Sequence, residues 1–266
     1  MSGPTLSSEY ASPTPLQVRI ETHARYSEHP DDPVAAVTAV LGLSGEESIA
    51  DIGCGDGRFL AHIAQSGHRG RLIGIDTSPA MVAAAGQIPG VEAVPGDAER
   101  LPFADRSICR TTARHMLYHV PHPVKALREF RRITSSGGMV AVTVNHPQTC
   151  SRTRELVARR AREYGLVPVE ELTNTVNSDT LPELMTEVFP DVQVHRFDNA
   201  LVFDRPEPLV RLAEAVFSFC GIDTNNPHRP DILAAVTTDI EDWFADHPGE
   251  IWRDPKGYII ATATVE

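Results

Sequence analysis

A glycine-rich stretch, ADIGCGDGRF at residues 50–59, follows an apolar run of the chain. Its glycines, Gly53, Gly55 and Gly57, stand at alternate positions, and a turn without side chains lets a ligand approach the main chain closely. Asp51 stands just before this turn. The stretch therefore predicts a turn after a strand that binds a ligand through its backbone.

Two further carboxylates follow apolar runs. Asp76 ends the run RLIGID, and a carboxylate at a strand end can accept two hydrogen bonds from a ribose diol. Asp97 follows the next run and can accept a hydrogen bond from the exocyclic amine of an adenine, with Ile75, Met81 and Leu101 placed to sandwich the ring. A ribose acceptor and an adenine acceptor together indicate an adenosine-containing cofactor.

The glycine spacing distinguishes among such cofactors. A dinucleotide pyrophosphate favours G-x-G-x-x-G, whereas this turn reads G-x-G-x-G and is followed by Arg58. Asp51 is badly placed beside a phosphate but suits an ammonium or a sulfonium. Lys125 and Lys256 are the only lysines in the sequence, so the lysine of an ATP-binding P-loop is missing. These features favour S-adenosyl-L-methionine over NAD or ATP.

The elements that must position these residues alternate between strand-like and helix-like runs. Predicted strands are 48–52, 71–76, 91–97, 107–113 and 137–145, and the helices between them are 57–67, 78–88 and 122–134. This alternation is typical of a parallel sheet with right-handed crossovers, in which ligands bind outside the carboxyl ends of the strands. Further along, helices are predicted at 151–165, 179–189, 207–220 and 231–246, with strands at 192–203 and 257–265.

The charge balance limits the partners. The 266 residues include 24 basic and 36 acidic ones, a formal net charge of −12, whereas a protein that holds a nucleic-acid backbone usually has a basic face. Arg152, Arg154, Arg159, Arg160 and Arg162 form a basic cluster, which we interpret as a solvated helix face. We therefore expect no nucleic-acid partner.

The sequence predicts a cytoplasmic protein. No apolar run reaches the roughly 18 residues that cross a bilayer, and the first residues lack a basic start followed by an apolar stretch, so we expect no membrane span and no secretory signal. Cys54, Cys109, Cys150 and Cys220 are far apart and form no CxxC pair. Their spacing argues against a zinc site or a disulfide framework and favours a reducing compartment.

Five stretches carry a resemblance to a known family: ADIGCGDGRF, LIGIDTSPAM, GDAERLPFAD, RHMLYHVPHPVKALREFRRI and GGMVAVTVN. In this order and spacing they resemble the class I S-adenosylmethionine-dependent methyltransferases, in the branch of the quinone-biosynthesis C-methyltransferases and many natural-product O-, N- and C-methyltransferases. The resemblance covers about residues 48–145. It departs from the family pattern in SICRTTA (107–113), where Cys109 and Arg110 replace an acid and a small residue. We expect there either a less buried strand or an Arg110 that pairs with a neighbour.

The resemblance implies roles for residues at the strand ends. Asp51, Gly53 and Gly55 would hold the methionine part of the cofactor, and Asp76 would bind the ribose. Ala113, at the end of the fourth strand, would touch the amino-acid part through its backbone.

The adenine and an N-terminal closing residue complete the implied site. Asp97 and Ala98 would bind the adenine. Relatives often close an N-terminal aromatic residue or an arginine over the cofactor, for which Arg25 and Tyr26 are candidates; in the alternative interpretation Tyr26 only packs the first helix. The full predicted cofactor-binding set is Tyr26, Asp51, Gly53, Cys54, Gly55, Asp76, Thr77, Met81, Asp97, Ala98, Glu99 and Ala113.

Histidines follow the fourth predicted strand, at positions that face the transferred methyl group in relatives. His115 and His119 are candidates for a general base, which helps when the nucleophile is a hydroxyl or an ammonium. Alternatively, His119 makes structural hydrogen bonds and His115 lines a pocket. Together with His122 they form a histidine cluster, but the acidic ligands of metal-dependent catechol-type enzymes are missing, so we expect no metal.

The predicted function is S-adenosylmethionine-dependent methylation of a small molecule at oxygen, nitrogen or carbon, in natural-product biosynthesis. The stretch ARHMLYH after the fourth strand lacks the Asn/Asp-Pro-Pro-Tyr/Phe motif of enzymes that methylate adenine in nucleic acids. Two alternatives stay open: a protein or tRNA methyltransferase that uses the Arg152–Arg162 helix, and a non-catalytic S-adenosylmethionine-binding protein. A homodimer is one option for its assembly.

We expect an α/β fold with a seven-stranded, mostly parallel Rossmann-like sheet, an antiparallel last strand and a helical cap. The predicted divisions are a disordered tail (1–15), an N-terminal helical cap (16–47), a cofactor-binding core (48–150), substrate-cap helices with a sixth strand at 192–203 (151–256), and a final core strand (257–266).

Overall fold

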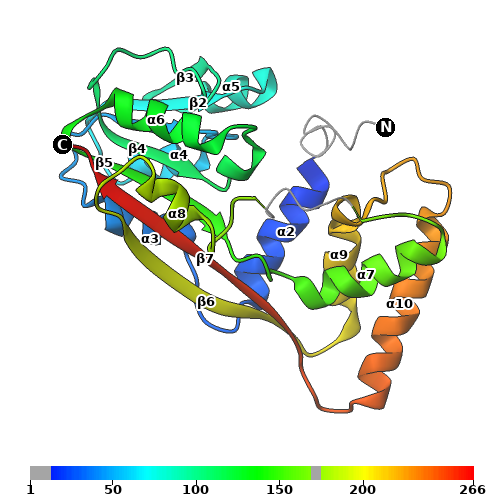
Figure 1. Ribbon diagram of the computed structural model, residues 1–266. Helices are drawn as coiled ribbons and strands as arrows, with labels where there is room; N and C mark the ends of the chain where they lie inside the picture. The colour runs from blue at the N-terminus through cyan, green and yellow to red at the C-terminus, as the bar shows by residue number, and fades with distance from the viewer. Residues whose placement is uncertain (1–12, 169–174) are drawn as a thin grey trace. The chain divides into compact units, whose positions relative to one another are not determined.

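The computed structural model describes residues 13–168 and 175–266 (Figure 1). The chain divides into two compact units. The helical unit comprises Met1–Asp31, Gln148–Glu171 and Asp198–Gly257, and the sheet unit comprises Asp32–Pro147, Leu172–Phe197 and Tyr258–Glu266. Among the described residues, no helix combines the length and the apolar character that a membrane span requires.

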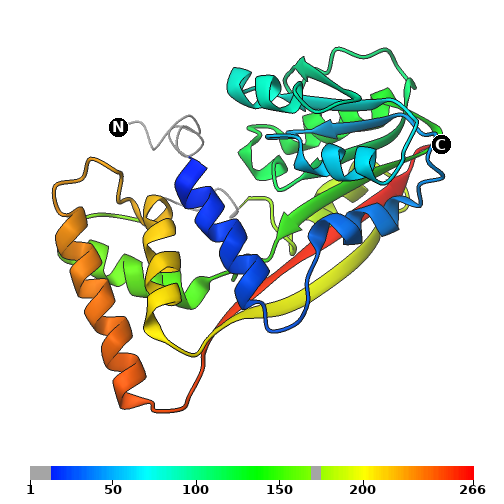
Figure 2. The ribbon, with the colours of Figure 1, turned by 180° about the vertical axis from the view of Figure 1, so that it is seen from behind.

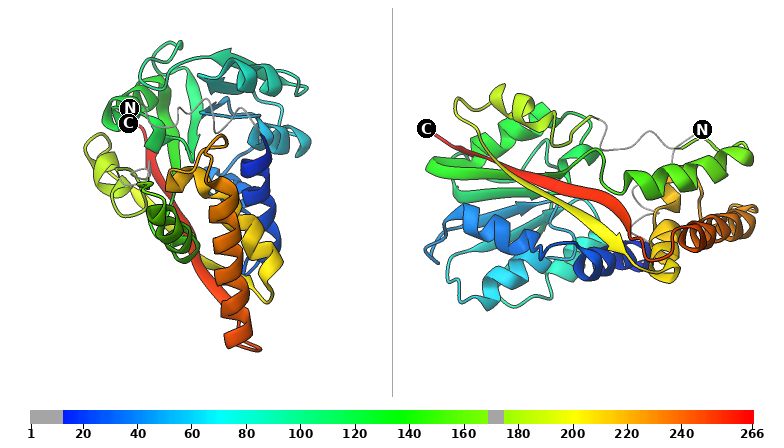
Figure 3. Two further views of the ribbon diagram at one scale, coloured as in Figure 1. Left: turned by 90° about the vertical axis from the view of Figure 1, so that its right-hand side faces the viewer. Right: turned by 90° about the horizontal axis from the view of Figure 1, so that it is seen from below.

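Seven strands form one sheet in the order β3-β2-β1-β4-β5-β7-β6. Their bounds are β1 Ile49–Ile52, β2 Leu72–Asp76, β3 Val91–Pro95, β4 Ile108–Arg114, β5 Thr134–Asn145, β6 Gln193–Phe203 and β7 Trp252–Thr264. The pairs β1–β2, β2–β3, β1–β4 and β4–β5 are parallel, whereas β7 runs antiparallel to β5. This arrangement confirms the predicted mostly parallel sheet with an antiparallel last strand. The two long strands β6 and β7 lie side by side (Figure 3).

Helices cover both faces of the sheet in the sheet unit. The helices are α3 Pro33–Leu41, α4 Arg58–Gln65, α5 Pro79–Ala85, η1 Leu117–His119, α6 Pro123–Ile133 and α8 Leu181–Thr186. Successive side chains of a strand point to opposite faces of the sheet, so alternate residues of β5 pack against the helices on one face or the other. Val140 and Val142 belong to the core that includes α6 and α8, and Ala141 belongs to the core that includes α3 and α4. Figure 2 shows α3 and α4 from behind.

The helical unit has an apolar core of its own. Its helices are α2 Pro13–Tyr26, α7 Ser151–Glu163, α9 Pro206–Ala215, η3 Phe217–Cys220 and α10 Arg229–Asp246. Fully buried Leu209, Phe217 and Ile232 belong to this core. The buried carboxylate of Asp254 on β7 accepts hydrogen bonds from the backbone N–H groups of Arg152 and Thr153, so β7 caps the start of α7.

The observed units differ from the predicted divisions. The N-terminal cap (16–47) is split, since α2 belongs to the helical unit whereas α3 belongs to the sheet unit, where Val37 and Leu41 share a core with Phe59 and Leu60 of α4. α8 also belongs to the sheet unit, since its Leu181 and Met185 share the core of α6. The predicted tail lies outside the described residues up to residue 12, and from Pro13 the chain is helical.

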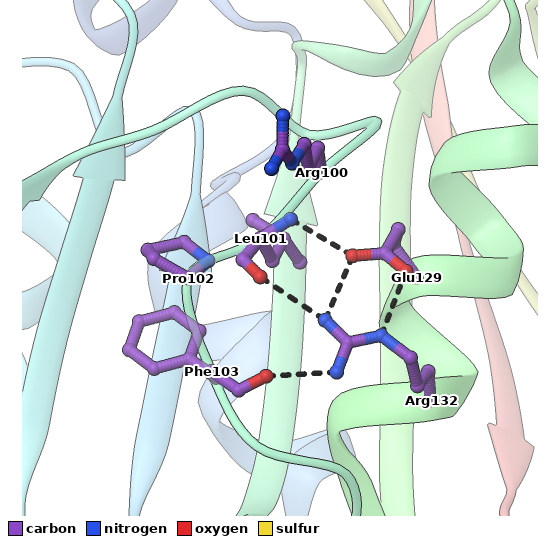
Figure 4. A pocket seen from close by; sticks show the side chains of 6 residues that line it. All are labelled: Arg100, Leu101, Pro102, Phe103, Glu129 and Arg132. Carbon is purple, nitrogen blue, oxygen red and sulfur yellow. Dashed lines mark hydrogen bonds and ion pairs between the residues drawn. The ribbon is translucent and has the colours of Figure 1, made fainter.

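Arg132 of α6 fixes the loop that follows β3. Its guanidinium donates to the backbone carbonyls of Leu101 (3.0 Å) and Phe103 (2.7 Å) and to both carboxylate oxygens of Glu129 (Figure 4). Glu129 in turn accepts from the N–H of Leu101 at 2.8 Å, and the hydrogen bond from Arg132 holds the pKa of Glu129 below its usual value. Asp97 and Ala98, which are predicted to bind adenine, belong to the same loop, so α6 holds that loop in place.

Replacing Arg132 by alanine is expected to lower the free energy of unfolding by about 1–2 kcal/mol, because two loop carbonyls and the Glu129 carboxylate lose their partner. The bond to exposed Asp105 adds little to this. Chemical denaturation measures the change. Arg128→Ala, at an exposed position on the same helix, is the control and is expected to change stability by less than about 0.5 kcal/mol. Equal losses in the two variants would contradict the anchoring role of Arg132.

Candidate functional site

The carboxyl ends of β1, β2 and β4 bring the predicted cofactor residues together. β1 lies between β2 and β4, and its last residue, Ile52, stands beside Ile75 on one side and Ala113 on the other. Asp51 therefore lies one residue from the end of β1, and Asp76 is the last residue of β2. The parallel register thus gathers residues that are far apart in the sequence at one edge of the sheet.

The glycine turn after β1 is open at one position. Gly53, Gly55 and Gly57 all have positive φ angles, of 67°, 56° and 82°. A Cβ atom on Gly53 would lie 2.6 Å from the Cβ of Met116, and one on Gly57 would lie 2.6 Å from Ile88. At Gly55, by contrast, no atom lies within 4 Å of such a Cβ. Gly53 and Gly57 are therefore needed for close packing, and Gly55 leaves the backbone open to a ligand.

Asp76 is held in place by the same turn. One of its carboxylate oxygens accepts from the N–H of Gly55 at 3.0 Å, and the other accepts from the N–H of Ser78 at 2.8 Å. A carboxylate oxygen has two lone pairs, so each oxygen keeps one for a further donor. The half-buried side chain is thus oriented before any ligand arrives and can still accept two hydroxyl groups.

The loop after β3 places its predicted residues in different environments. Asp97 is exposed and its carboxylate accepts from the N–H of Glu99 at 2.9 Å, while Ala98 is buried. The carboxylate of Glu99 accepts from the backbone N–H of His122 (3.0 Å) and from the ammonium of Lys125 (3.1 Å). Glu99 therefore binds the start of α6, which gives it a structural role beside the predicted one.

Cys54, in the centre of the turn, is buried and lies against β2. A Cβ atom on Gly74 would lie 2.8 Å from its sulfur atom. Burial raises the pKa of the Cys54 thiol, and the nearby carboxylates of Asp51 and Asp76 raise it further. The thiol is therefore protonated at neutral pH and fills space instead of acting as a nucleophile.

Asp51 has a partner that the local sequence does not reveal. Its carboxylate is fully buried and accepts from the hydroxyl of Thr112 at 2.8 Å. The guanidinium of Arg114 donates to both of its oxygens, at 3.3 Å from Nε and 3.0 Å from Nη2, and lies 4.3 Å from the centre of the Phe59 ring. The positive charge beside Asp51 thus comes from the protein itself. The one sequence signal for this pair is that an arginine follows strand-like residues at the same sheet edge.

The two candidate bases lie just beyond β4. His115 has a positive φ of 52°. Its backbone N–H donates to the backbone carbonyl of Thr143 at 2.8 Å, so the backbone of β5 holds this unusual conformation. His119 ends the short helix η1, and its ring packs edge-on against Tyr118 with centroids 4.6 Å apart. Because η1 begins only at Leu117, the two histidines do not share a helix face. Within the described residues no group of His, Cys, Asp and Glu has the geometry of a metal site.

The remaining predicted residues lie at the edges of this region or in the other unit. Thr77 is exposed directly after Asp76, and Met81 is half-buried on α5. Tyr26 belongs to the helical unit, where its ring stacks on Phe203 with centroids 5.1 Å apart. This stacking packs the end of α2 against β6, and the closing role over the cofactor stays a prediction.

The departure from the family pattern in β4 has a local explanation. Arg110 is half-buried and donates to the backbone carbonyls of Leu41 (3.1 Å) and Cys109 (3.0 Å). The expected pairing of Arg110 with a neighbour is therefore confirmed.

A cavity of about 630 Å³ lies elsewhere in the sheet unit and is lined by Arg100, Leu101, Pro102, Phe103, Glu129 and Arg132 (Figure 4). Of the residues with a predicted role, it includes Leu101, which is predicted to pack against the adenine ring and is buried here.

Comparison with known proteins identifies the family. The family described as "Methyltransferase domain" matches residues 50–142. A demethylmenaquinone methyltransferase of Mycolicibacterium vanbaalenii is 31% identical over 184 residues, which cover 69% of this chain and 73% of that protein. In three further curated relatives the chain spans from 29% to 62% of their length.

Solved structures show the same fold. A protein described as a methyltransferase of an antibiotic biosynthesis pathway, from Anabaena variabilis, has a TM-score of 0.63 and 20% identity, covering 87% of this chain and 96% of that one. The cyclase SpnF has a TM-score of 0.56 and 17% identity and covers 99% of both chains. The fold, the strand-end carboxylates around an open glycine turn and the sequence match agree, and the chain belongs to the class I S-adenosylmethionine-dependent methyltransferases.

Proposed function

We propose that the protein transfers a methyl group from S-adenosyl-L-methionine to a small-molecule acceptor. The observation that carries this proposal is the Asp76 carboxylate, which the N–H groups of Gly55 and Ser78 orient beside an open glycine turn. Two oxygens that each keep a free lone pair match the two hydroxyl groups of a ribose. The family membership supports the same cofactor.

The donor set of the site fits this cofactor. Asp76 would hold the ribose, and Asp97 with the buried Ala98 would hold the adenine. Gly53 and Gly55 would hold the methionine part through the backbone, with Ala113 at the adjacent end of β4. When bound, the cofactor supplies an electrophilic methyl group on a sulfonium. The chain itself has to orient the acceptor and exclude water.

We assign the candidate base to His115 or His119. Both follow β4 and are half-buried, and the unusual backbone of His115 supports a functional reason for its conformation. A neutral imidazole can accept the proton that a hydroxyl or ammonium acceptor loses. For a neutral amine acceptor alignment alone would suffice, whereas a carbon acceptor has to lose the hydrogen that the methyl group replaces.

The acceptor and the setting are proposed at the level of class. A small molecule agrees with the demethylmenaquinone named in a relative, and we assign its recognition to the helical unit. A cytoplasmic location and a homodimer remain predictions from the sequence.

The protein or tRNA alternative depends on the arginines of α7. Arg159 and Arg160 form ion pairs with Asp239, and Arg162 pairs with Glu155. Three of the five arginines thus already have acidic partners, which supports the interpretation of this cluster as an ordinary charged helix surface. A named cyclase has the same fold, so the fold by itself does not establish methyl transfer, and the decisive assay has to detect a methylated product.

The proposed function is tested by incubating the protein with S-adenosyl-L-methionine labelled in its methyl group and separate fractions of small metabolites, proteins and tRNA. We expect the label in a small molecule, identified by mass spectrometry. Label in protein or tRNA would support that alternative, and label in no fraction would support a non-catalytic role.

Asp76→Ala is expected to weaken binding of S-adenosyl-L-homocysteine by about 150-fold or more, since the two hydrogen bonds from the ribose to a charged group contribute about 1.5–3 kcal/mol each. Isothermal titration calorimetry measures the affinity, and circular dichroism checks the fold. The control is Asp191→Ala, an exposed carboxylate in the same unit, which removes the same charge and is expected to leave the affinity unchanged. Unchanged affinity in Asp76→Ala would refute the ribose assignment.

Alanine at the catalytic histidine is expected to lower kcat by about 10²- to 10⁴-fold with little change in cofactor affinity, because the general base is lost. His115→Ala and His119→Ala are measured side by side with the acceptor found above, with calorimetry for the cofactor. The variant that loses turnover identifies the base. Full turnover in both would show that the reaction needs alignment only.

A further inference from the structure

Only one member of the ion pair at the end of β1 and β4 is open to a ligand. The side chain of Asp51 is 0% exposed, whereas that of Arg114 is 17% exposed. A ligand at this edge of the sheet therefore meets a guanidinium, with the carboxylate behind it. This arrangement reverses the sequence-based expectation, in which the charge offered to the methionine part was the negative charge of Asp51.

The guanidinium of Arg114 is rigidly held and still has donors to offer. Nε and Nη2 donate to Asp51, and the group stacks on the Phe59 ring at 4.3 Å. An arginine carries five N–H donors, and these two bonds use two of them. Within the described part of the chain, Nη1 makes no hydrogen bond to protein. Its two N–H groups are oriented by the bonds that the other nitrogens make.

The position of Arg114 determines which part of a ligand it can meet. It directly follows Ala113, whose neighbour across the parallel pair is Ile52, the residue before the glycine turn. Met116, two residues further on, packs against Gly53 of that turn. Arg114 thus stands beside the turn to which the amino-acid part of the cofactor is assigned, on the side of the turn that faces β4.

We propose that Arg114 binds the α-carboxylate of the methionine part of the cofactor and that Asp51 is the positioning residue that fixes its guanidinium. The proposal rests on the proposed function. A planar guanidinium binds a carboxylate through charge-assisted hydrogen bonds, and a buried Asp51 prevents it from rotating away. The charges of Asp51 and Arg114 balance each other, so the carboxylate of the ligand meets a guanidinium whose own charge is already compensated inside the protein.

The test compares two ligands that differ in one group. S-adenosyl-L-methionine and its decarboxylated analogue, the corresponding propylamine, share the adenosine, the sulfonium and the amine. The wild-type protein is expected to bind the carboxylate-containing ligand about 10- to 100-fold more tightly by calorimetry. In Arg114→Gln this preference is expected to fall to nearly onefold, with the affinity for the analogue little changed, and Arg114→Lys is expected to retain part of it.

The control variant is Arg110→Gln, which removes another half-buried arginine from β4, and its ligand preference is expected to match the wild type. If Arg114→Gln does not fold because Asp51 is left as an unpaired buried charge, the double variant Asp51→Asn/Arg114→Gln removes that charge and is measured instead.

The outcomes separate this inference from the proposed function. A purely structural Arg114 would weaken both ligands equally and leave the preference at its wild-type value, which would overturn the inference. A wild-type protein that binds both ligands equally would overturn it too, while the cofactor assignment would stand. A wild-type protein that binds neither ligand would overturn the proposed function itself.

Discussion

A carboxylate that is fully buried at the end of a central strand needs a partner, and this requirement organises the sheet edge. Asp51 lies on β1, between β2 and β4, where water cannot solvate its charge. Thr112 and Arg114, both on β4, supply the compensating hydrogen bonds. The parallel register places Thr112 directly beside Asp51, so the pairing of the two strands and the burial of the charge depend on each other. His115 directly follows Arg114, so the anchored arginine also fixes the backbone next to this candidate base.

The glycine turn and Asp76 form the complementary half of the site. Main-chain N–H groups orient the Asp76 carboxylate, and the carboxylate in turn holds Gly55 in its left-handed conformation. One residue therefore serves both the local structure and the ligand. Such preorganisation lowers the conformational entropy that binding would otherwise cost. It also explains how a short turn of glycines, which have no side chains of their own, can hold its backbone open.

Local patterns in the sequence were sufficient for the elements and for single residues, but not for partners across the sheet. Apolar runs that end at turn-forming residues predict the strands at 48–52 and 71–76. The acidic residues stand at the ends of these runs. The bond between Asp51 and Arg114 depends on a register between strands that are not consecutive in the chain. The same holds for Glu99, whose carboxylate binds the start of α6, and for α3, which was assigned to a cap but joins the core of α4. In each case tertiary packing decided what local sequence leaves open.

The apolar core of the helical unit is separate from the two cores that cover the faces of the sheet. The residues assigned to the cofactor lie, except for Tyr26, in the sheet unit, whereas the helical unit has its own buried Leu209, Phe217 and Ile232. Substitutions in the core of the helical unit therefore leave the packing behind Asp51 and Asp76 in place. The fold is shared with a named cyclase, so the fold alone does not determine the reaction. The identity of the acceptor therefore has to be established by the transferred methyl group itself.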